Sequence, residues 1–376
     1  MFCDTAGAVV YRCAVLPLCP LPQYIHIHDL CPPFTLGVVV SRIVLVTGAN
    51  GEIGHSLLEA FASSGDRDVI SVDLRPLGDA QRGYVKWSFE GDISDPKLIE
   101  QLESFDIAEI YHLAALLSTS AEKNPELAHR VNVNGTMGLL SMARRIGQRT
   151  GSAVKFLFPS TIAVYGMPSL EVKTSAGAVA EDVYLDATTM YGINKLYCER
   201  LGVYMSERYG QLTDDAGEKT VDFRALRFPG LISAFTVPSG GTSDYAPEMI
   251  HAAAQGKPYA CFVRPDARIP FMAMPDGVTA LLNLAAAPRE SLTRRVYNIG
   301  AFAPTAEEIA MKVKSAFPAA EITYAPHPKR QAIIDSWCAD VDDSAARRDW
   351  GWKPTFDMDT AFDTYLIPNI AGVYAG

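Results

Sequence analysis

The chain has 376 residues, of which 48% are hydrophobic and 20% are charged, and its formal net charge is −10. This length allows a large core and about two domains. An acidic chain without a basic run argues against binding to nucleic acid or to an anionic membrane surface. The sequence also lacks the run of roughly 18 apolar residues that a membrane span requires.

Residues 1–41 differ from the rest of the chain. They hold four of the seven cysteines and show no periodic pattern, so we expect a disordered extension without a role in the chemistry. The His26-Ile27-His28-Asp29 tract lacks further partners for a metal, and we expect no metal site. Scattered cysteines without a CxxC pair favour a reducing compartment, the cytoplasm, over a disulfide framework.

Short apolar segments alternate with helical stretches from residue 42 onward. Strands are predicted near 43–47, 69–73, 86–90, 109–113 and 155–160. This alternation predicts an α/β fold with a Rossmann-type doubly wound parallel sheet. In such a sheet, ligands bind at the carboxyl ends of the strands.

A glycine-rich turn follows the first predicted strand, with glycines at 48, 51 and 54 before an amphipathic helix. Glycines let the backbone turn tightly and approach a pyrophosphate, which lies at the positive end of the helix. The spacing is GxxGxxG instead of GxGxxG. The predicted cofactor contacts of this turn are Gly48, Asn50, Gly51, Glu52, Ile53 and Gly54.

The second predicted strand ends in Asp73, nineteen residues after Gly54. A carboxylate at this position binds the adenosine ribose hydroxyls and disfavours a 2′-phosphate. NAD is therefore the expected cofactor. Arg75 could accommodate a phosphate, which leaves NADP as the alternative.

Small and polar residues follow the next two strands. We expect cofactor contacts from Asp92, Ile93, Leu113, Ala114 and Ala115. His112 ends a buried strand, where a packed and hydrogen-bonded core residue is more common than an acid or base. Asn132 is a poor helix former in a predicted helix, and we expect its side chain to hold the neighbouring strand and to border the cofactor.

Tyr191 and Lys195 are four residues apart on a predicted helix, so they share one face. An ammonium beside a phenol favours the phenolate and lowers the tyrosine pKa, which gives a general base. An exposed tyrosine and lysine without a catalytic role would have the same spacing. The predicted strand end at Ser160 and Thr161, thirty residues before Tyr191, supplies the hydroxyls that favour the catalytic interpretation.

The segment FPSTIAVYG at 158–166, together with YGINK at 191–195, resembles the extended short-chain dehydrogenase/reductase family. The resemblance implies that Thr161 hydrogen-bonds the reacting oxygen and that Tyr191 exchanges its proton. It also implies that Lys195 binds the nicotinamide ribose and lowers the tyrosine pKa. These are the three catalytic residues that we expect.

Later segments resemble the short-chain type of L-threonine 3-dehydrogenase, and the similarity runs from about 42 to 360. They lie at 114–118, 226–233, 240–246, 330–337 and 342–352. The resemblance implies NAD-dependent oxidation of the 3-hydroxyl of L-threonine to 2-amino-3-oxobutanoate. It implies substrate contacts from Ser118, Thr161, Tyr191 and Thr242, and nicotinamide contacts from Leu231 and Ile232.

Several segments depart from this family. The loop reads PSGGTS at 238–243, where the family has three glycines and two threonines, and 266–273 lacks a threonine and a tyrosine. The polar insertion at 211–220 is predicted to form a surface hairpin. These differences leave open which small β-hydroxy acid is the substrate.

A nucleotide-sugar epimerase and a non-catalytic sensor are the two alternative functions. A nucleotide-sugar epimerase of the same extended family needs basic partners for a diphosphate, and the 240–246 loop offers none. A non-catalytic sensor that binds NAD or NADP typically lacks the tyrosine or the lysine, whereas this chain has both. The dehydratases of this family usually have an acidic residue after the catalytic threonine. Here Ile162 follows Thr161, so a dehydration reaction is disfavoured.

The expected organisation has three parts. The extension at 1–41 precedes an NAD-binding domain at 42–230, to which 271–300 return. Residues 231–270 and 301–376 are expected to form a small α/β substrate-binding domain. The resemblance also implies a homodimer through a four-helix interface that includes the helix of Tyr191, with apolar spacing at Leu196, Leu201, Tyr204 and Met205.

Overall fold

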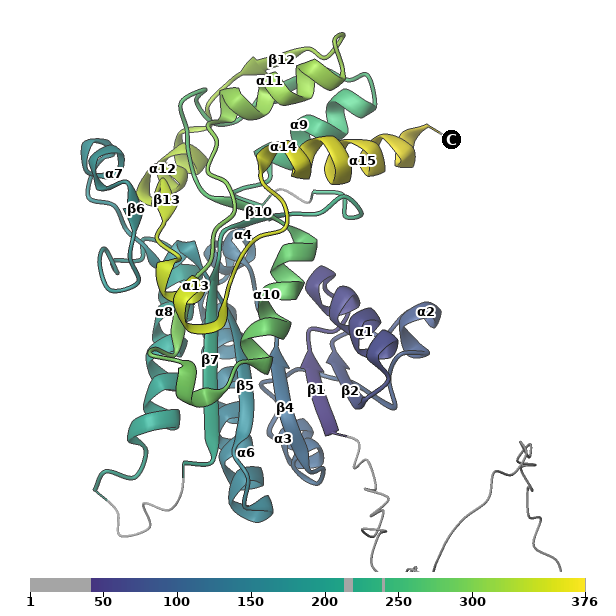
Figure 1. Cartoon of the computed structure of the whole chain (residues 1–376), viewed down its shortest axis with the longest axis vertical. Helices are drawn as coiled ribbons and strands as arrows, with labels where there is room; N and C mark the ends of the chain where they lie inside the picture. The colour runs from purple at the N-terminus through teal and green to yellow at the C-terminus, as the bar shows by residue number, and fades with distance from the viewer. Residues whose placement is uncertain (1–41, 213–218, 239–240, 376) are drawn as a thin grey trace, which may run out of the picture. The chain divides into compact units, whose positions relative to one another are not determined.

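The computed structural model describes residues 42–212, 219–238 and 241–375. Within these residues a seven-stranded sheet has the order β11-β7-β5-β4-β1-β2-β3, and every neighbouring pair is parallel (Figure 1). Its strands are β1 (Arg42–Thr47), β2 (Arg67–Asp73), β3 (Trp87–Glu90), β4 (Ile107–His112), β5 (Val154–Thr161), β7 (Val221–Phe228) and β11 (Val296–Asn298).

All five predicted strands are present, with ends that differ by one or two residues. The Rossmann-type prediction is therefore confirmed. The strand order reverses between β1 and β4, and this switch point is where open α/β sheets bind ligands. Sequence analysis did not predict β7 and β11 as individual strands.

Side chains of the central strands alternate between two hydrophobic clusters on opposite faces of the sheet. On β1, Val44 and Val46 pack with α1 (Glu52–Ser64) and α10 (Met274–Ala286). Leu45 between them packs with the opposite cluster. The helices on that face are α3 (Pro96–Glu103), α6 (Gly135–Thr150) and α8 (Met190–Val203). Burial on both faces explains why β1 reads as a continuous apolar run.

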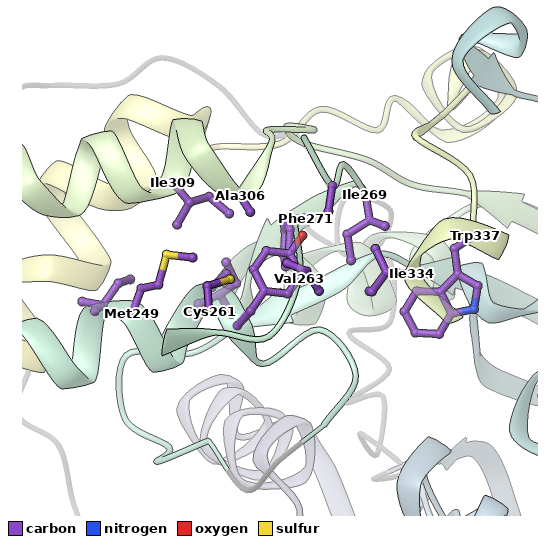
Figure 2. Packing of buried hydrophobic residues seen from close by; sticks show 14 of the residues in the cluster. Met249, Cys261, Val263, Ile269, Phe271, Ala306, Ile309, Ile334 and Trp337 are labelled. Carbon is purple, nitrogen blue, oxygen red and sulfur yellow. The ribbon is translucent and has the colours of Figure 1, made fainter. Parts of the chain in front are cut away.

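A third hydrophobic cluster lies beyond the carboxyl ends of the strands (Figure 1). Figure 2 shows Met249, Cys261 and Phe271 packed beneath Ile309, with Trp337 at the edge of the group. Its elements are β8 (Gly230–Ile232), α9 (Tyr245–Ala254), β9 (Tyr259–Cys261), β10 (Phe271–Ala273), α11 (Ala306–Ala316), β12 (Ile322–Tyr324), α12 (Pro328–Ser336), β13 (Asp340–Val341) and α15 (Ile367–Tyr374). Ile162 and Val164, which follow β5, belong to the same cluster. The predicted domain boundaries stay a prediction.

Shorter α-helices and strands connect these elements, together with 3-10 and π-helical turns. These α-helices and strands are α2 (Asp79–Arg82), α4 (Ser118–Lys123), α5 (Pro125–Ala128), α7 (Leu170–Ala176), β6 (Ala178–Val179), α13 (Ser344–Trp350) and α14 (Met358–Thr360). No helix among the described residues is long and apolar enough to cross a membrane. The predicted extension at 1–41 and most of the predicted hairpin, 213–218, lie outside these residues.

Candidate active site

The turn after β1 has the backbone that its glycines permit. Gly48 has a φ of 69°, and a Cβ there would lie 2.6 Å from the backbone nitrogen of Ala114. A Cβ on Gly54 would lie 2.6 Å from the carbonyl oxygen of Ala49. Helix α1 begins after Gly51, and no side chain caps its first turn. Free N–H groups at this helix start fit the pyrophosphate of a dinucleotide.

Asp73 lies beside this turn at the end of β2. Its carboxylate accepts hydrogen bonds from the backbone nitrogen of Asn50, at 2.9 Å, and from that of Arg75, at 3.2 Å. The Asn50 side chain donates to the carbonyls of Arg75 and Pro76. The glycine turn and the predicted ribose-binding carboxylate are therefore joined directly.

The ends of β3 and β4 border the same region. Asp92 accepts hydrogen bonds from the backbone nitrogen and hydroxyl of Ser94, both at 2.8 Å, and the neighbouring Ile93 is buried. After β4, the backbone nitrogens of Leu113 and Ala114 donate to Thr47, and Ala115 is half-buried. The five predicted cofactor contacts thus follow the carboxyl ends of β3 and β4, two strands of the same parallel sheet that are separated by β1 and β2.

His112 is a core residue, as the sequence indicates. Nδ1 lies 2.8 Å from the Thr47 hydroxyl, and Nε2 lies 2.9 Å from the Thr136 hydroxyl. The side chain is fully enclosed, and this burial lowers its pKa to about 3, with a further contribution from Lys195. A neutral imidazole with both nitrogens occupied stabilises the fold but is not available as an acid or base.

Asn132 holds the segment that follows β4. Its side chain lies in the π-helical turn His129–Asn134, accepts from the backbone nitrogen of Leu116 at 2.8 Å and donates to the Leu116 carbonyl at 3.0 Å. Leu116 lies beyond the end of β4, so Asn132 holds the segment that follows the strand, whereas the sequence predicted that it would hold the strand itself.

Thr161 and Tyr191 lie on segments that pack directly against each other. Helix α8 begins after Thr189, whose side chain accepts from the backbone nitrogen of Gly192 at 3.1 Å. A Cβ on Gly192 would collide with the carbonyl oxygen of Ala163. Ala163 in turn donates its backbone nitrogen to the Thr161 hydroxyl, at 3.1 Å. Thr161 and Tyr191 are both half-buried.

Lys195 is buried one turn further along α8. Its Nζ donates to the carbonyl oxygen of Pro159 at 2.7 Å and lies 5.8 Å from the centre of the Tyr191 ring. Burial lowers the pKa of Lys195 to about 8, while Cys198 and Glu199 act in the opposite direction. Burial also raises the pKa of Tyr191 above its ordinary value.

The sequence prediction of a lowered tyrosine pKa is therefore wrong for this arrangement. The ammonium of Lys195 binds a carbonyl oxygen instead of the phenol oxygen. Desolvation, which penalises the charged phenolate, is the one cause that shifts the Tyr191 pKa.

Two of the four predicted substrate residues, Ser118 and Thr242, come together from distant segments. The Thr242 hydroxyl donates to the Ser118 hydroxyl at 3.3 Å, and Ser118 is the first residue of α4. On β8, Leu231 is half-buried, whereas the Ile232 side chain is 1% exposed and belongs to the third cluster. Of this pair, the Leu231 side chain is thus the one that has exposed surface.

Arg330 was missed by sequence reasoning. Its guanidinium donates to the carbonyl of Gly241, next to Thr242, and lies 3.2 Å from the centre of the Phe262 ring. Arg330 opens the 330–337 segment that carried the family resemblance, so the signal was present. The sequence did not show which loop this residue would contact.

Among the described residues, no group of histidine, cysteine and carboxylate side chains is placed to hold a metal ion. The polar groups around the strand ends are backbone N–H and hydroxyl groups, the buried ammonium of Lys195 and, as an acceptor, the Asp73 carboxylate. This donor set fits a dinucleotide, whose pyrophosphate and ribose require these groups.

Comparisons with known proteins agree with this geometry. The model of the NAD dependent epimerase/dehydratase family matches residues 44–300. The chain is 37% identical over 327 residues to a mitochondrial L-threonine 3-dehydrogenase of Bos taurus, covering 86% of this chain and 81% of that protein.

Solved structures give the same result. A monomeric L-threonine 3-dehydrogenase from a metagenome is 35% identical, with a TM-score of 0.76 over 88% of this chain and 99% of that chain. A GalE-like L-threonine dehydrogenase from Cupriavidus necator, in its holo form, is 34% identical, with a TM-score of 0.74 over 89% and 99%. The similarity therefore extends well beyond the glycine turn.

Proposed function

The chain belongs to the NAD dependent epimerase/dehydratase family, and on this premise we propose that it oxidises the 3-hydroxyl of L-threonine to 2-amino-3-oxobutanoate with NAD. The observation that carries the proposal is the packing of the Thr161 segment against the start of α8, which bears Tyr191. The relatives described as L-threonine dehydrogenases support the choice of substrate.

Each proposed catalytic residue has one task. Tyr191 takes the proton of the substrate hydroxyl, and Thr161 donates a hydrogen bond to the oxygen on which charge develops. Lys195, whose ammonium is buried one turn further along α8, holds the cofactor ribose. NAD supplies the hydride acceptor when bound. Because burial raises the pKa of Tyr191, we expect the oxidation rate to rise as pH increases above neutrality.

The proposed binding site for the amino acid combines hydroxyl and amide donors. The Ser118 and Thr242 hydroxyls lie together. The backbone nitrogen of Gly241, the residue before Thr242, donates to Asp244 at 2.6 Å. Such donors suit a small carboxylate better than a diphosphate, which requires basic partners. L-Threonine and similar small β-hydroxy acids are therefore preferred over nucleotide sugars.

A substrate screen tests this proposal. Reduction of NAD is followed by absorbance with L-threonine, other small β-hydroxy acids and nucleotide sugars. We expect turnover of L-threonine that falls by about 100-fold or more in Tyr191→Phe. Tyr197→Phe is the matched control, because Tyr197 lies on the same helix and is 54% exposed. Conversion of a nucleotide sugar without turnover of any hydroxy acid would contradict the proposal and favour the epimerase.

We also propose a homodimer through α6 and α8. Ile193 and Tyr197 on α8 are at least half exposed, and Tyr204 and Met137 are 43% and 42% exposed. Leu196 and Leu201 are half-buried, and Met205, which the sequence pattern included, is buried in the core of this chain. The exposed apolar residues thus share only Tyr204 with the expected set.

Light scattering at several protein concentrations tests the dimer. We expect the mass of two chains for the wild type and a shift towards one chain in Tyr197→Glu, with Lys97→Glu on the exposed start of α3 as the control. A wild-type mass of one chain would contradict the dimer, and the metagenome relative, described as monomeric, gives that outcome a precedent.

For the compartment, we propose the cytoplasm. Cys198, Cys261 and Cys338 are free and buried, which suits a reducing environment. The bovine relative is described as mitochondrial, so fractionation of cells that express the full chain, with a matrix marker, is the decisive measurement. Co-purification with the matrix marker would contradict the cytoplasmic assignment.

A further inference from the structure

A buried ion pair lies directly behind the proposed catalytic residues. Glu199 on α8 and Arg227 on β7 are 1% and 2% exposed. The guanidinium binds both carboxylate oxygens, with Nε to Oε1 at 2.9 Å and Nη2 to Oε2 at 2.7 Å. Two parallel bonds fix the orientation of the carboxylate as well as its position.

The same carboxylate binds the residue before Thr161. The Ser160 hydroxyl donates to Oε1 of Glu199 at 2.5 Å. One turn earlier on α8, Lys195 donates to the carbonyl of Pro159. Helix α8 is therefore attached to β5 at two successive residues, and Thr161 is the next residue along that strand.

Arg227 extends this attachment away from the catalytic residues. Its Nη1 donates to the Tyr165 hydroxyl at 2.9 Å and to the Glu181 carbonyl at 2.7 Å. The Tyr165 hydroxyl then donates to Asn298 at 2.7 Å. Arg227 is on β7, and the groups bound to it directly or through Tyr165 come from β11 and from the segments that follow β5 and β6, so Glu199 is held from several sides and has little freedom to move.

A contribution to stability alone does not account for this arrangement. Two charges taken out of water lose solvation, and replacing a buried ion pair by apolar residues is often neutral or stabilising. A role in placing the reacting groups explains the buried ion pair better, because a misplacement of about 1 Å between such groups reduces a rate by about 100-fold. Glu199 lies next to groups whose relative placement decides the reaction.

We propose that Glu199, oriented by Arg227, is a positioning residue that acts through Ser160 to set Thr161 relative to Tyr191 and Lys195. The inference rests on the proposed function for the identity of the reaction. It assigns no contact with substrate or cofactor to Glu199. Its effect should therefore be on the rate of the chemical step and not on binding.

Kinetic analysis of Glu199→Gln tests this inference. The substitution keeps the shape of the side chain and removes its charge. We expect kcat with L-threonine to fall at least about tenfold, whereas KM for NAD changes less than about twofold. Ser160→Ala removes only the hydroxyl and should give a smaller loss in the same direction. It serves as the second variant if Glu199→Gln does not fold.

The matched control is Glu207→Gln. Glu207 follows α8 and pairs with Arg295 at 2.8 Å, away from Thr161. If buried and half-buried ion pairs only stabilise the fold, both Gln variants should lower the melting temperature and keep kcat. An unchanged kcat in folded Glu199→Gln would overturn the inference.

A double-mutant cycle shows whether the effect passes through Thr161. In a Thr161→Ala background, Ser160→Ala should no longer reduce kcat, because the group that it positions has been removed. An additive loss would contradict the proposed route.

Crystal structures separate this inference from the proposed function. If the wild type turns over no hydroxy acid, the proposed function fails, but the positions of Thr161 and Tyr191 can still be compared between wild type and Glu199→Gln. A displaced Thr161 would support the positioning role, and an unchanged pair would refute it.

Discussion

The hydroxyl oxygens of Ser118 and Thr242 lie 3.3 Å apart, although the two residues are separated by 124 positions in the chain. Ser118 begins α4, immediately beyond the segment held by Asn132, and Thr242 precedes α9. The pair therefore connects the chain that follows β4 with the third hydrophobic cluster. Two hydroxyls at such a junction can bind one small polar ligand together.

Removing one hydroxyl of this pair should weaken substrate binding more than the chemical step. For Ser118→Ala we expect KM for L-threonine to rise about fivefold, consistent with the loss of about 1 kcal/mol for one hydrogen bond. Steady-state kinetics at saturating NAD measure this change. Ser120→Ala on the exposed side of the same helix is the control. An equal effect in both variants would remove Ser118 from the proposed site.

Asp73 should decide between NAD and NADP. Asp73→Ala removes the carboxylate beside the glycine turn, and we expect the preference for NAD over NADP, measured as the ratio of kcat/KM values, to fall about tenfold or more. The exposed Asp79→Ala is the control. A wild-type preference for NADP would show that Arg75 has the larger influence.

The strands and the glycine turn could be predicted because short segments of the sequence determine them. The strands around Thr47 and Asp73 are short apolar runs, and Gly48 and Gly54 mark a turn in which a Cβ would collide with the backbone. The packing of Gly192 against Ala163 follows from two motifs that the sequence displays. These features depend on residues that are close together in the chain or that belong to a recognised pattern.

The remaining features depend on burial and on long-range partners. The pKa of Tyr191 is raised by desolvation of its half-buried side chain, which helical spacing to Lys195 does not reveal. Glu199 is visible in the sequence one turn after Lys195, but its partner Arg227 comes from β7, a strand that sequence analysis did not predict. The surroundings of a site therefore require the tertiary structure.

His112 should make the fold sensitive to acid. Its pKa is about 3 in the folded chain, against an ordinary value of 6.5. Between these values the unfolded chain binds the extra proton, so stability is complete above pH 6.5 and is lost as pH falls towards 3.

Between pH 7.5 and pH 5, protonation linked to His112 should lower the free energy of unfolding by about 2 kcal/mol. Urea titrations should show a smaller loss in His112→Gln over this range, and an unchanged loss in the exposed His129→Gln. Identical pH dependence in wild type and His112→Gln would contradict a neutral buried imidazole.

Lys195 should be required for turnover although its buried ammonium lowers the stability of the fold near neutral pH. Its pKa is about 8 in the folded chain, against an ordinary value of 10.5. The unfolded chain therefore binds more protons between these values, and the contribution of Lys195 to stability rises as pH increases from 8 to 10.5. Lys195→Met removes this titration together with the bond to Pro159, and it should abolish most of the turnover.

The free-energy difference between wild type and Lys195→Met should change by about 2 kcal/mol in favour of the wild type between pH 7 and pH 10. Denaturant unfolding across this range measures it, with Lys97→Met as the exposed control. Because the buried ammonium opposes folding at pH 7, a variant that is inactive yet loses little stability there is the expected result. A difference that does not vary with pH would show that Lys195 is not desolvated in solution.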